Sequence, residues 1–189
     1  MNKKAALAIA SGLSVLIALN YFFFMDISSY DDAFYERVVV QRAIDGDTVE
    51  LEDGRVVRLL NINTPEKGET GSEEAQAFLR KFENQSVELD VTGTEKYGRL
   101  LGRIYAPDYL NLELVKSGLA HIFLVDQKEL EIFNRVQTEA INLQAGIWRH
   151  SEKYNCLSGE IDKKSEILVL TRECDISLEE WTVKDESTK

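Results

Sequence analysis

Two short segments of the sequence combine acidic, basic and oxygen-bearing side chains that suit binding of charged groups. The segment IDGDT places Asp45 and Asp47 on either side of a glycine. The segment RLLNINTPE begins with Arg58 in an apolar run and ends in a proline-containing turn from Asn63 to Glu66. Carboxylates and other oxygens are ligands for a hard metal ion, and a buried guanidinium needs an anionic partner. The two segments therefore indicate a site for a metal ion or an anion.

A third segment, EKYGR, presents Lys96, Tyr97 and a second arginine, Arg99, in a polar loop. Taken singly, each segment also fits an ordinary turn, because runs such as DGD are common. Asn63 is the unusual residue, since a hard metal ion is better served by the charge of an aspartate. The order and spacing of the segments carry more weight than any one of them.

The segments fall at the ends of predicted β-strands. Residues 47–53 alternate between apolar and polar side chains, the pattern of a half-buried strand. Five strands are predicted, at 36–44, 47–53, 55–62, 86–92 and 100–106, and three helices, at 72–84, 110–118 and 127–145. Three strands, a helix, two strands and then helices is the order of a five-stranded Greek-key barrel of the OB type. We therefore predict an α+β domain with this barrel over residues 36–150.

An uncharged stretch near the amino end predicts a transmembrane helix ahead of this domain. Residues 5–25 would span roughly 31 Å as a helix, about the thickness of the hydrocarbon core of a bilayer. Two lysines precede the stretch and three aspartates follow it, so the amino end is expected in the cytoplasm and the remainder outside. We expect residues 1–25 to be a single-pass signal anchor and residues 26–35 a stalk. A cleaved secretory signal and a buried soluble helix are the alternatives.

Residues 151–189 form a less regular tail. One strand is predicted at 166–170, and the tail is too short to close a core of its own. The only two cysteines, Cys156 and Cys174, lie in this tail. They could form a disulfide outside the cytoplasm or be two unrelated thiols. Their spacing does not indicate a metal site.

The charge of the chain disfavours one class of function. The net charge is −11, and residues 36–150 contain 14 Lys and Arg against 20 Asp and Glu, a net −6. Proteins that grip nucleic acid mainly through its phosphates are usually basic. The composition therefore argues against a tight, non-specific nucleic-acid binder and allows an enzyme with a small cationic site.

The motifs, taken in order, resemble those of the staphylococcal nuclease (thermonuclease) family. The matching segments are AIDGDTVEL, RLLNINTPE, KYGRLLGRIYA, LVKSGLAHI and GIW, and they cover about residues 36–150. The resemblance implies an OB barrel with helices that hydrolyses DNA and RNA phosphodiesters with calcium. The tail segment ISLEEWTVKDE is similar to the start of a lamin-tail-type domain, which implies a truncated module over residues 151–189.

The resemblance implies which residues hold the calcium ion. Asp47 matches a metal-ligand aspartate, Thr64 a residue that lends its backbone oxygen, and Asp45 a carboxylate behind the ligands. The family's second ligand aspartate falls on Asn63, whose amide keeps an oxygen but lacks the charge. We therefore expect calcium binding to be weakened.

The resemblance also implies which residues act on the substrate. Glu66 matches the glutamate that positions or deprotonates the attacking water. Arg58 and Arg99 match the arginines that bind the scissile phosphate and stabilise transition-state charge. Lys96 and Tyr97 match residues on the terminal-phosphate side of the substrate site.

The family's base pocket is not preserved. Its two tyrosines fall on Leu124 and Asp126, and the neighbouring Phe123 is expected in the core rather than stacked on a base. Two functions therefore remain to be weighed. We expect a membrane-anchored, calcium-dependent nuclease that acts on DNA or RNA outside the cytoplasm, with no obligate protein partner. The alternative is a non-catalytic OB module that binds nucleic acid or protein, with Asn63 as the mark of a decayed metal site.

Overall fold

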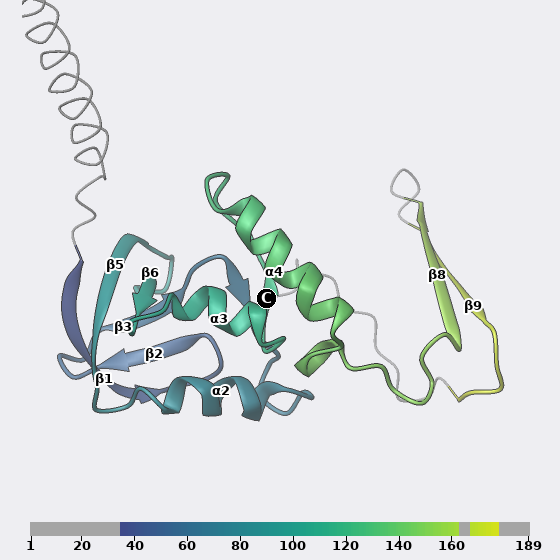
Figure 1. Ribbon diagram of the computed structural model, residues 1–189, viewed down its shortest axis with the longest axis horizontal. Coiled ribbons are helices and arrows are strands. Elements are labelled where there is room, and N and C mark those ends of the chain that lie inside the picture. Colours follow the sequence, from purple (N-terminus) through teal and green to yellow (C-terminus); the bar gives the residue numbers. More distant parts are fainter. Residues whose placement is uncertain (1–34, 163–166, 178–189) are drawn as a thin grey trace, which may run out of the picture.

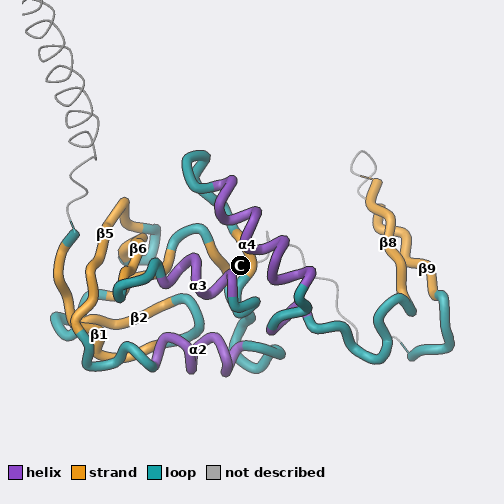
Figure 2. Tube along the Cα trace, in the orientation of Figure 1, coloured by secondary structure: helices purple, strands orange, loops and turns teal. Residues whose placement is uncertain are grey.

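The computed structural model of the chain describes residues 35–162 and 167–177. Five strands close into a barrel, as predicted from the sequence, and their order around it is β1-β2-β3-β6-β5 (Figure 1). The barrel strands are β1 Glu36–Ala43, β2 Thr48–Leu51, β3 Val56–Leu59, β5 Ser86–Thr94 and β6 Leu100–Tyr105. The helices are α2 Ser72–Arg80, α3 Leu110–Lys116 and α4 Leu130–Asn142, with a short 3-10 turn, η1, at Gly146–Trp148 (Figure 2).

The barrel closes because β1 is bent and because β3 and β6 pair in parallel. Residues Glu36–Val39 of β1 pair with β5, and residues Val40–Ala43 pair with β2, with a register shift between Val40 and Arg42. Such an irregularity bends a strand and increases its twist, which helps β1 to pair with both β5 and β2. The parallel pairing places Arg58 opposite Leu101 and so joins the two halves of the sheet.

The core lies inside the barrel and beneath the helices. Inward-facing residues recur at every second strand position, as strand alternation requires. They are Val38, Val40, Val49, Leu51, Val57, Leu59, Val87, Leu89 and Ile104, each 7% exposed or less. Leu114 of α3 and Phe133 of α4 are fully buried and belong to the same cluster. The apolar alternation that predicted the strands is therefore the alternation that fills the core.

The predicted strand over residues 55–62 is interrupted. β3 ends at Leu59, the chain turns at Asn61, and a second short strand, β4 Ile62–Asn63, pairs with β7 His121–Ile122. Asn61 has a φ of 69°, a left-handed conformation that asparagine adopts more readily than most residues. The turn moves Asn63 out of the barrel sheet and back toward Arg58.

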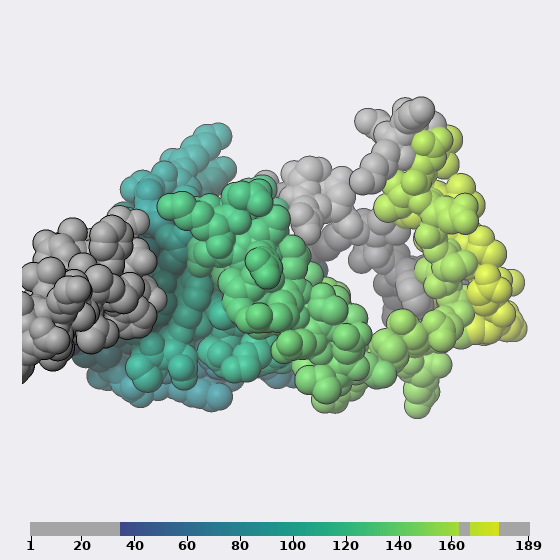
Figure 3. All heavy atoms as spheres, turned by 45° about the horizontal axis from the view of Figure 1, so that its top comes forward, coloured from purple at the N-terminus to yellow at the C-terminus, as the bar shows by residue number. Residues whose placement is uncertain are grey.

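The tail forms a hairpin that lies away from the barrel (Figures 1 and 3). It consists of β8 Leu157–Asp162 and β9 Ile167–Arg172, with Cys156 and Cys174 joined by a disulfide at its base. The strand predicted at 166–170 corresponds to β9, whereas β8 has too few apolar residues to stand out in the sequence. The segment similar to a lamin-tail domain lies mostly outside the described residues.

The predicted anchor at 1–25 also lies outside the described residues, as does the stalk apart from Tyr35. Within the ranges that the structure describes, no helix has the length and apolar character needed to cross a bilayer.

Candidate functional site

The pairing of β2 with β3 brings the first two predicted site residues together. Thr48 lies opposite Arg58 in the antiparallel register, so Asp47, one residue earlier, lies beside the guanidinium. Nη1 of Arg58 forms an ion pair with Oδ1 of Asp47, and the two side chains are only 12% and 8% exposed. Arg58 therefore has the anionic partner that a buried guanidinium requires.

The carboxylate of Asp47 also holds the turn that follows β4. The backbone N–H and the hydroxyl of Thr64 donate to Oδ2 of Asp47 over 3.1 and 3.2 Å. The hydroxyl of Thr48 donates to Oδ1 over 3.1 Å. Asp47 thus accepts hydrogen bonds from two separate segments while it pairs with Arg58, and it fixes their relative positions.

Arg58 reaches across the turn to Asn63. Its Nη2 donates to Oδ1 of Asn63 over 2.5 Å and to the carbonyl of Ile62 over 3.3 Å. Asn63 and Thr64 are 4% and 5% exposed. Four predicted site residues, Asp47, Arg58, Asn63 and Thr64, therefore form one buried polar cluster at the edge of the barrel.

Gly46 allows this cluster to pack against α2. A Cβ atom built at residue 46 would lie 2.6 Å from Oγ1 of Thr64 and 2.7 Å from Cβ of Ala75. Real Cβ atoms do not approach other atoms so closely, so the glycine of the DGD segment is required by space. Asp45, on its other side, accepts a hydrogen bond from the N–H of Asp47 over 3.0 Å.

The pKa of Asp45 is raised, first by burial and then by the negative charge of Asp47. A raised carboxyl pKa means that ionisation costs stability in the folded state, so this cost appears as the pH rises above the ordinary aspartate value of about 3.9.

We expect Asp45→Asn, which keeps an oxygen for the N–H of Asp47, to increase the free energy of unfolding at about pH 7 and to leave it nearly unchanged at about pH 3. Urea unfolding at the two pH values checks this; an equal effect at both would contradict it.

Arg99 lies beside the cluster rather than within it. Its backbone precedes β6, two residues before Leu101, which pairs with Arg58. The Nε of Arg99 forms an ion pair with Oε1 of Glu95, the two side chains being 34% and 22% exposed. Arg58 of β3 and Arg99, next to the first residue of the neighbouring strand β6, therefore each have an acidic partner.

The remaining predicted residues occupy exposed loops. Lys96 and Tyr97 lie in the β5–β6 loop, where the Lys96 ammonium is 5.8 Å from the centre of the Tyr97 ring. Glu66 is exposed, and its N–H donates to Oε2 of Glu69 over 2.9 Å in the turn before α2. Leu124, which replaces a base-pocket tyrosine, is 84% exposed. Phe123, expected in the core, is half-buried.

The donor set fits a hard cation of modest affinity. Asp47 supplies a carboxylate, Thr64 a backbone carbonyl, and Asn63 an amide oxygen, all of them oxygen ligands of the kind that calcium uses. The pKa of Asp45 is raised by burial and, second, by repulsion from Asp47, and this repulsion also favours a positive charge nearby. In the part of the chain that the structure describes, however, no three His, Cys, Asp or Glu side chains gather as a metal-binding group.

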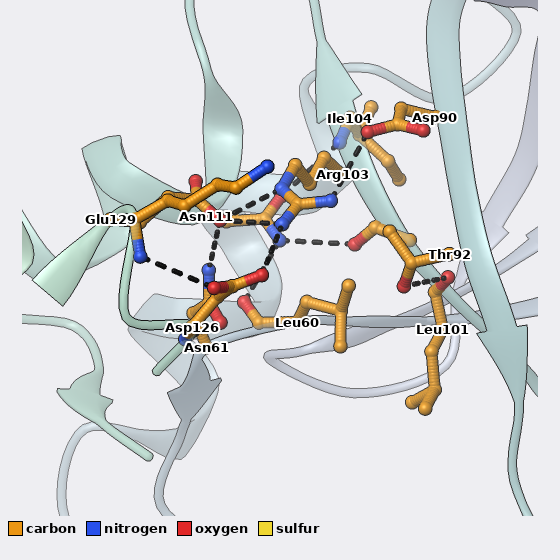
Figure 4. A network of polar contacts seen from close by, with 12 residues as sticks. Leu60, Asn61, Asp90, Thr92, Leu101, Arg103, Ile104, Asn111, Asp126 and Glu129 are labelled. Carbon is orange, nitrogen blue, oxygen red and sulfur yellow. Dashed lines mark hydrogen bonds and ion pairs between the residues drawn. The ribbon is translucent and has the colours of Figure 1, made fainter. Parts of the chain in front are cut away.

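The sequence interpretation missed two residues, the buried Asn61 and the partly buried Arg103. Asn61 and Arg103 both take part in a polar network that reaches Glu129 at the start of α4 (Figure 4). Arg103 is an arginine within a barrel strand, which is the same signal that singled out Arg58. Asn61 gave no comparable signal, because its role depends on the turn that interrupts the predicted strand.

Comparison with known proteins gives consistent matches. The family described as "Staphylococcal nuclease homologue" matches residues 56–150. An "Uncharacterized endonuclease" of Escherichia coli O157:H7 is 30% identical over 120 residues, which are 60% of this chain and 77% of that protein. The "Micrococcal nuclease" of Shigella flexneri is 29% identical over 124 residues, 58% of this chain and 71% of its own. "Endonuclease YhcR" of Bacillus subtilis (strain 168) is 25% identical over 139 residues, 60% of this chain but 11% of that longer protein.

Proposed function

The chain belongs to the family of staphylococcal nuclease homologues, and from this premise we propose that it hydrolyses phosphodiester bonds of DNA, RNA or both in a calcium-dependent reaction. The observation that carries the proposal is the buried cluster in which Asp47, Arg58 and Thr64 meet. There, oxygen ligands for a cation adjoin a guanidinium that suits a phosphate. The relatives named as endonucleases and nucleases support the nuclease part of this proposal.

The calcium ion would be held by the carboxylate of Asp47 and the carbonyl of Thr64, with Asn63 and Asp45 beside them. A bound divalent ion supplies charge that polarises a phosphoryl oxygen and acidifies a water molecule. Two features predict weak affinity. Asn63 contributes no charge, and the oxygens of Asp47 already accept from Arg58 and Thr64, so a cation competes with these donors.

The chain's own residues bind the phosphate and move the proton. Arg58 and Arg99 donate to the phosphoryl oxygens and stabilise the negative charge that builds on them during attack. Arg58 is held in advance by Asp47 and Asn63, which lowers the cost of orienting it. Glu66, two residues beyond Thr64, accepts the proton of the attacking water. Lys96 and Tyr97 flank the substrate from the β5–β6 loop.

Substrate binding is expected to be weak and salt-sensitive. The domain carries a net charge of −6 between residues 36 and 150, so the polyanion is repelled except near the two arginines and Lys96. Calcium would reduce this repulsion as well as take part in the reaction. Assays therefore need low ionic strength and millimolar calcium to reveal the activity.

We expect Asn63→Asp to tighten calcium binding by about tenfold, because it adds a charged oxygen ligand where the amide stands. The added charge is tolerated because Nη2 of Arg58 lies 2.5 Å from Oδ1 of residue 63. Isothermal titration calorimetry with calcium measures the change. Asn84→Asp is the matched control, since it adds the same charge at an exposed position on the turn before β5. Unchanged or weaker affinity in Asn63→Asp would show that this residue does not face the metal.

The second candidate function is a non-catalytic module that binds nucleic acid or protein, and Asn63 is the observation that favours it. The two functions are separated by incubating the full chain with labelled single-stranded DNA and RNA, with calcium or with a chelator. A nuclease yields shortened products only with calcium. A binding module retards the intact strands and leaves their length unchanged. The same experiment shows which nucleic acid is preferred.

The proposed location is the outer face of a membrane, with residues 5–25 in the bilayer as a single-pass anchor. The support is the length and uncharged character of this stretch and the lysines before it. Fractionation of cells that express the full chain, and of cells that express a chain without residues 1–25, tests this proposal. We expect only the full chain in the membrane fraction. Recovery of the full chain as a shortened, soluble form would favour cleavage of a secretory signal instead.

A further inference from the structure

The turn between Arg58 and Asn63 is fixed by the residue at its centre. Asn61 is 5% exposed, and its Nδ2 donates to Oε2 of Glu129 over 2.8 Å. Its Oδ1 accepts from the N–H of Asp126 over 3.1 Å, and its carbonyl accepts from the N–H of Phe123 over 2.8 Å. Asn61 is therefore hydrogen-bonded on three sides to the segment that leads into α4.

Glu129 is in turn held by Arg103 of β6. Its Oε2 accepts from Nε and Nη2 of Arg103 over 2.9 and 2.6 Å, in addition to Asn61. Arg103 also donates to Asp90 over 3.1 Å and lies 3.8 Å from Asp126. Figure 4 shows these side chains converging beside the barrel. Burial disfavours the charge on Arg103, but the hydrogen bonds and charge of Glu129 outweigh it, so the pKa of Arg103 is raised.

Leu60, the residue before Asn61, is held in place by a separate set of hydrogen bonds from Asn111. The side chain of Asn111 is completely buried, and its Nδ2 donates to the carbonyls of Leu60 and Gly102 over 3.0 and 3.1 Å. Its Oδ1 accepts from the N–H of Ile104 over 3.2 Å. Leu60 is therefore tied to β6 through Asn111. Asn61, at the centre of the turn, is tied to the segment that leads into α4.

This arrangement determines where the phosphate-binding and metal-binding groups lie. Arg58 precedes the turn, and Asn63 and Thr64 follow it. Nη2 of Arg58 reaches Oδ1 of Asn63 over 2.5 Å only because the chain reverses between these two residues. Asn61 and Glu129 are hydrogen-bonded to each other on one side of the turn, whereas Asp47 and Arg58 contact Asn63 and Thr64 on the other. The backbone of residues 61–64 joins the two groups of contacts.

We propose that Asn61 and Glu129 are positioning residues that set the geometry of the cluster formed by Asp47, Arg58, Asn63 and Thr64. This inference rests on the proposed function. Loss of either side chain leaves the barrel closed, because the strands pair without them, but it frees the turn to shift. A shift of the order of 1 Å at catalytic groups reduces turnover by up to about 100-fold.

The test compares Asn61→Gly and Glu129→Gln with wild type in the full chain. Glycine adopts the φ of 69° at residue 61 without strain. The first variant therefore removes only the side-chain hydrogen bonds of Asn61 to Glu129 and Asp126. Glu36→Gln is the matched control, because Glu36 also pairs with an arginine, Arg55, over 2.7 and 2.8 Å. We expect kcat to fall about 10- to 100-fold in the two test variants, with KM changed little, and to stay near wild type in the control.

A second readout does not depend on catalysis. The N–H of Thr64 is protected from exchange by its bond to Asp47, so hydrogen–deuterium exchange at this amide reports the geometry of the turn. We expect faster exchange at Thr64 in Asn61→Gly and Glu129→Gln, with core amides of Val57 and Leu89 unchanged. Wild-type kcat together with unchanged protection of Thr64 would overturn the inference, as would a uniform loss of protection across the barrel. If the wild type itself does not cleave with calcium, the proposed function fails, and the exchange rates alone decide whether the turn is positioned as proposed.

Discussion

Replacing Arg99 with alanine is expected to lower kcat for phosphodiester cleavage by about 10²–10³-fold, the usual cost of losing one donor to transition-state charge. The loss falls mainly on kcat because the negative charge on the phosphoryl oxygens increases in the transition state. The fold should survive, since the ion pair of Arg99 with Glu95 is partly exposed and such pairs contribute about 0–1 kcal/mol. Steady-state kinetics and circular dichroism of the purified variant measure both effects.

Arg42→Ala is the control for this variant. Arg42 also forms a side-chain ion pair, with Glu50 over 2.5 Å, and its side chain is 61% exposed. We expect the control to keep wild-type turnover and to lose no more stability than Arg99→Ala. Turnover of Arg99→Ala within a few-fold of wild type would remove Arg99 from the catalytic residues.

Replacing Asp47 with alanine is expected to abolish calcium-dependent activity and to destabilise the fold by about 3–5 kcal/mol. The destabilisation arises because Arg58, only 12% exposed, is left without its carboxylate. The N–H and hydroxyl of Thr64 also lose their acceptor. Urea unfolding followed by circular dichroism measures the loss of stability, and calcium titration calorimetry measures the loss of binding.

The double variant Asp47→Ala, Arg58→Ala separates these two contributions. Removing Arg58 as well takes away the uncompensated buried charge, so the double variant should be more stable than Asp47→Ala alone. It should nevertheless remain inactive and fail to bind calcium. If Asp47→Ala loses less than about 1 kcal/mol, the ion pair with Arg58 does not stabilise the fold in the way its burial implies.

Much of the barrel could be predicted because its signals are local. Alternation of apolar residues at positions such as Val49 and Leu51 matches the inward-facing positions of β2. The interruption at Asn61 could not be predicted in this way. Leu59, Leu60 and Ile62 read as one continuous apolar strand, and the turn is stabilised by contacts to Glu129 and Asp126, which are remote in the sequence.

The residues of the buried cluster were all among the site residues predicted from the sequence, but their contacts with one another were not predicted. An arginine in an apolar strand indicated that Arg58 has an anionic partner, while Asp47 was assigned to a metal ion. The strand register makes Asp47 that partner, so the same carboxylate pairs with Arg58 and is the proposed calcium ligand. Only the three-dimensional pairing reveals this competition, and it gives a reason for weak calcium affinity beyond the neutral side chain of Asn63.

The most direct test of the central claim is the initial rate of single-stranded DNA cleavage by the full chain at low salt, with millimolar calcium and with excess chelator. The buried cluster of Asp47, Arg58 and Thr64 predicts cleavage that requires calcium, stops on chelation and is restored when calcium is added back. Absence of cleavage at millimolar calcium, in a preparation shown to be folded, would contradict the assignment of this cluster as the active site of a calcium-dependent nuclease.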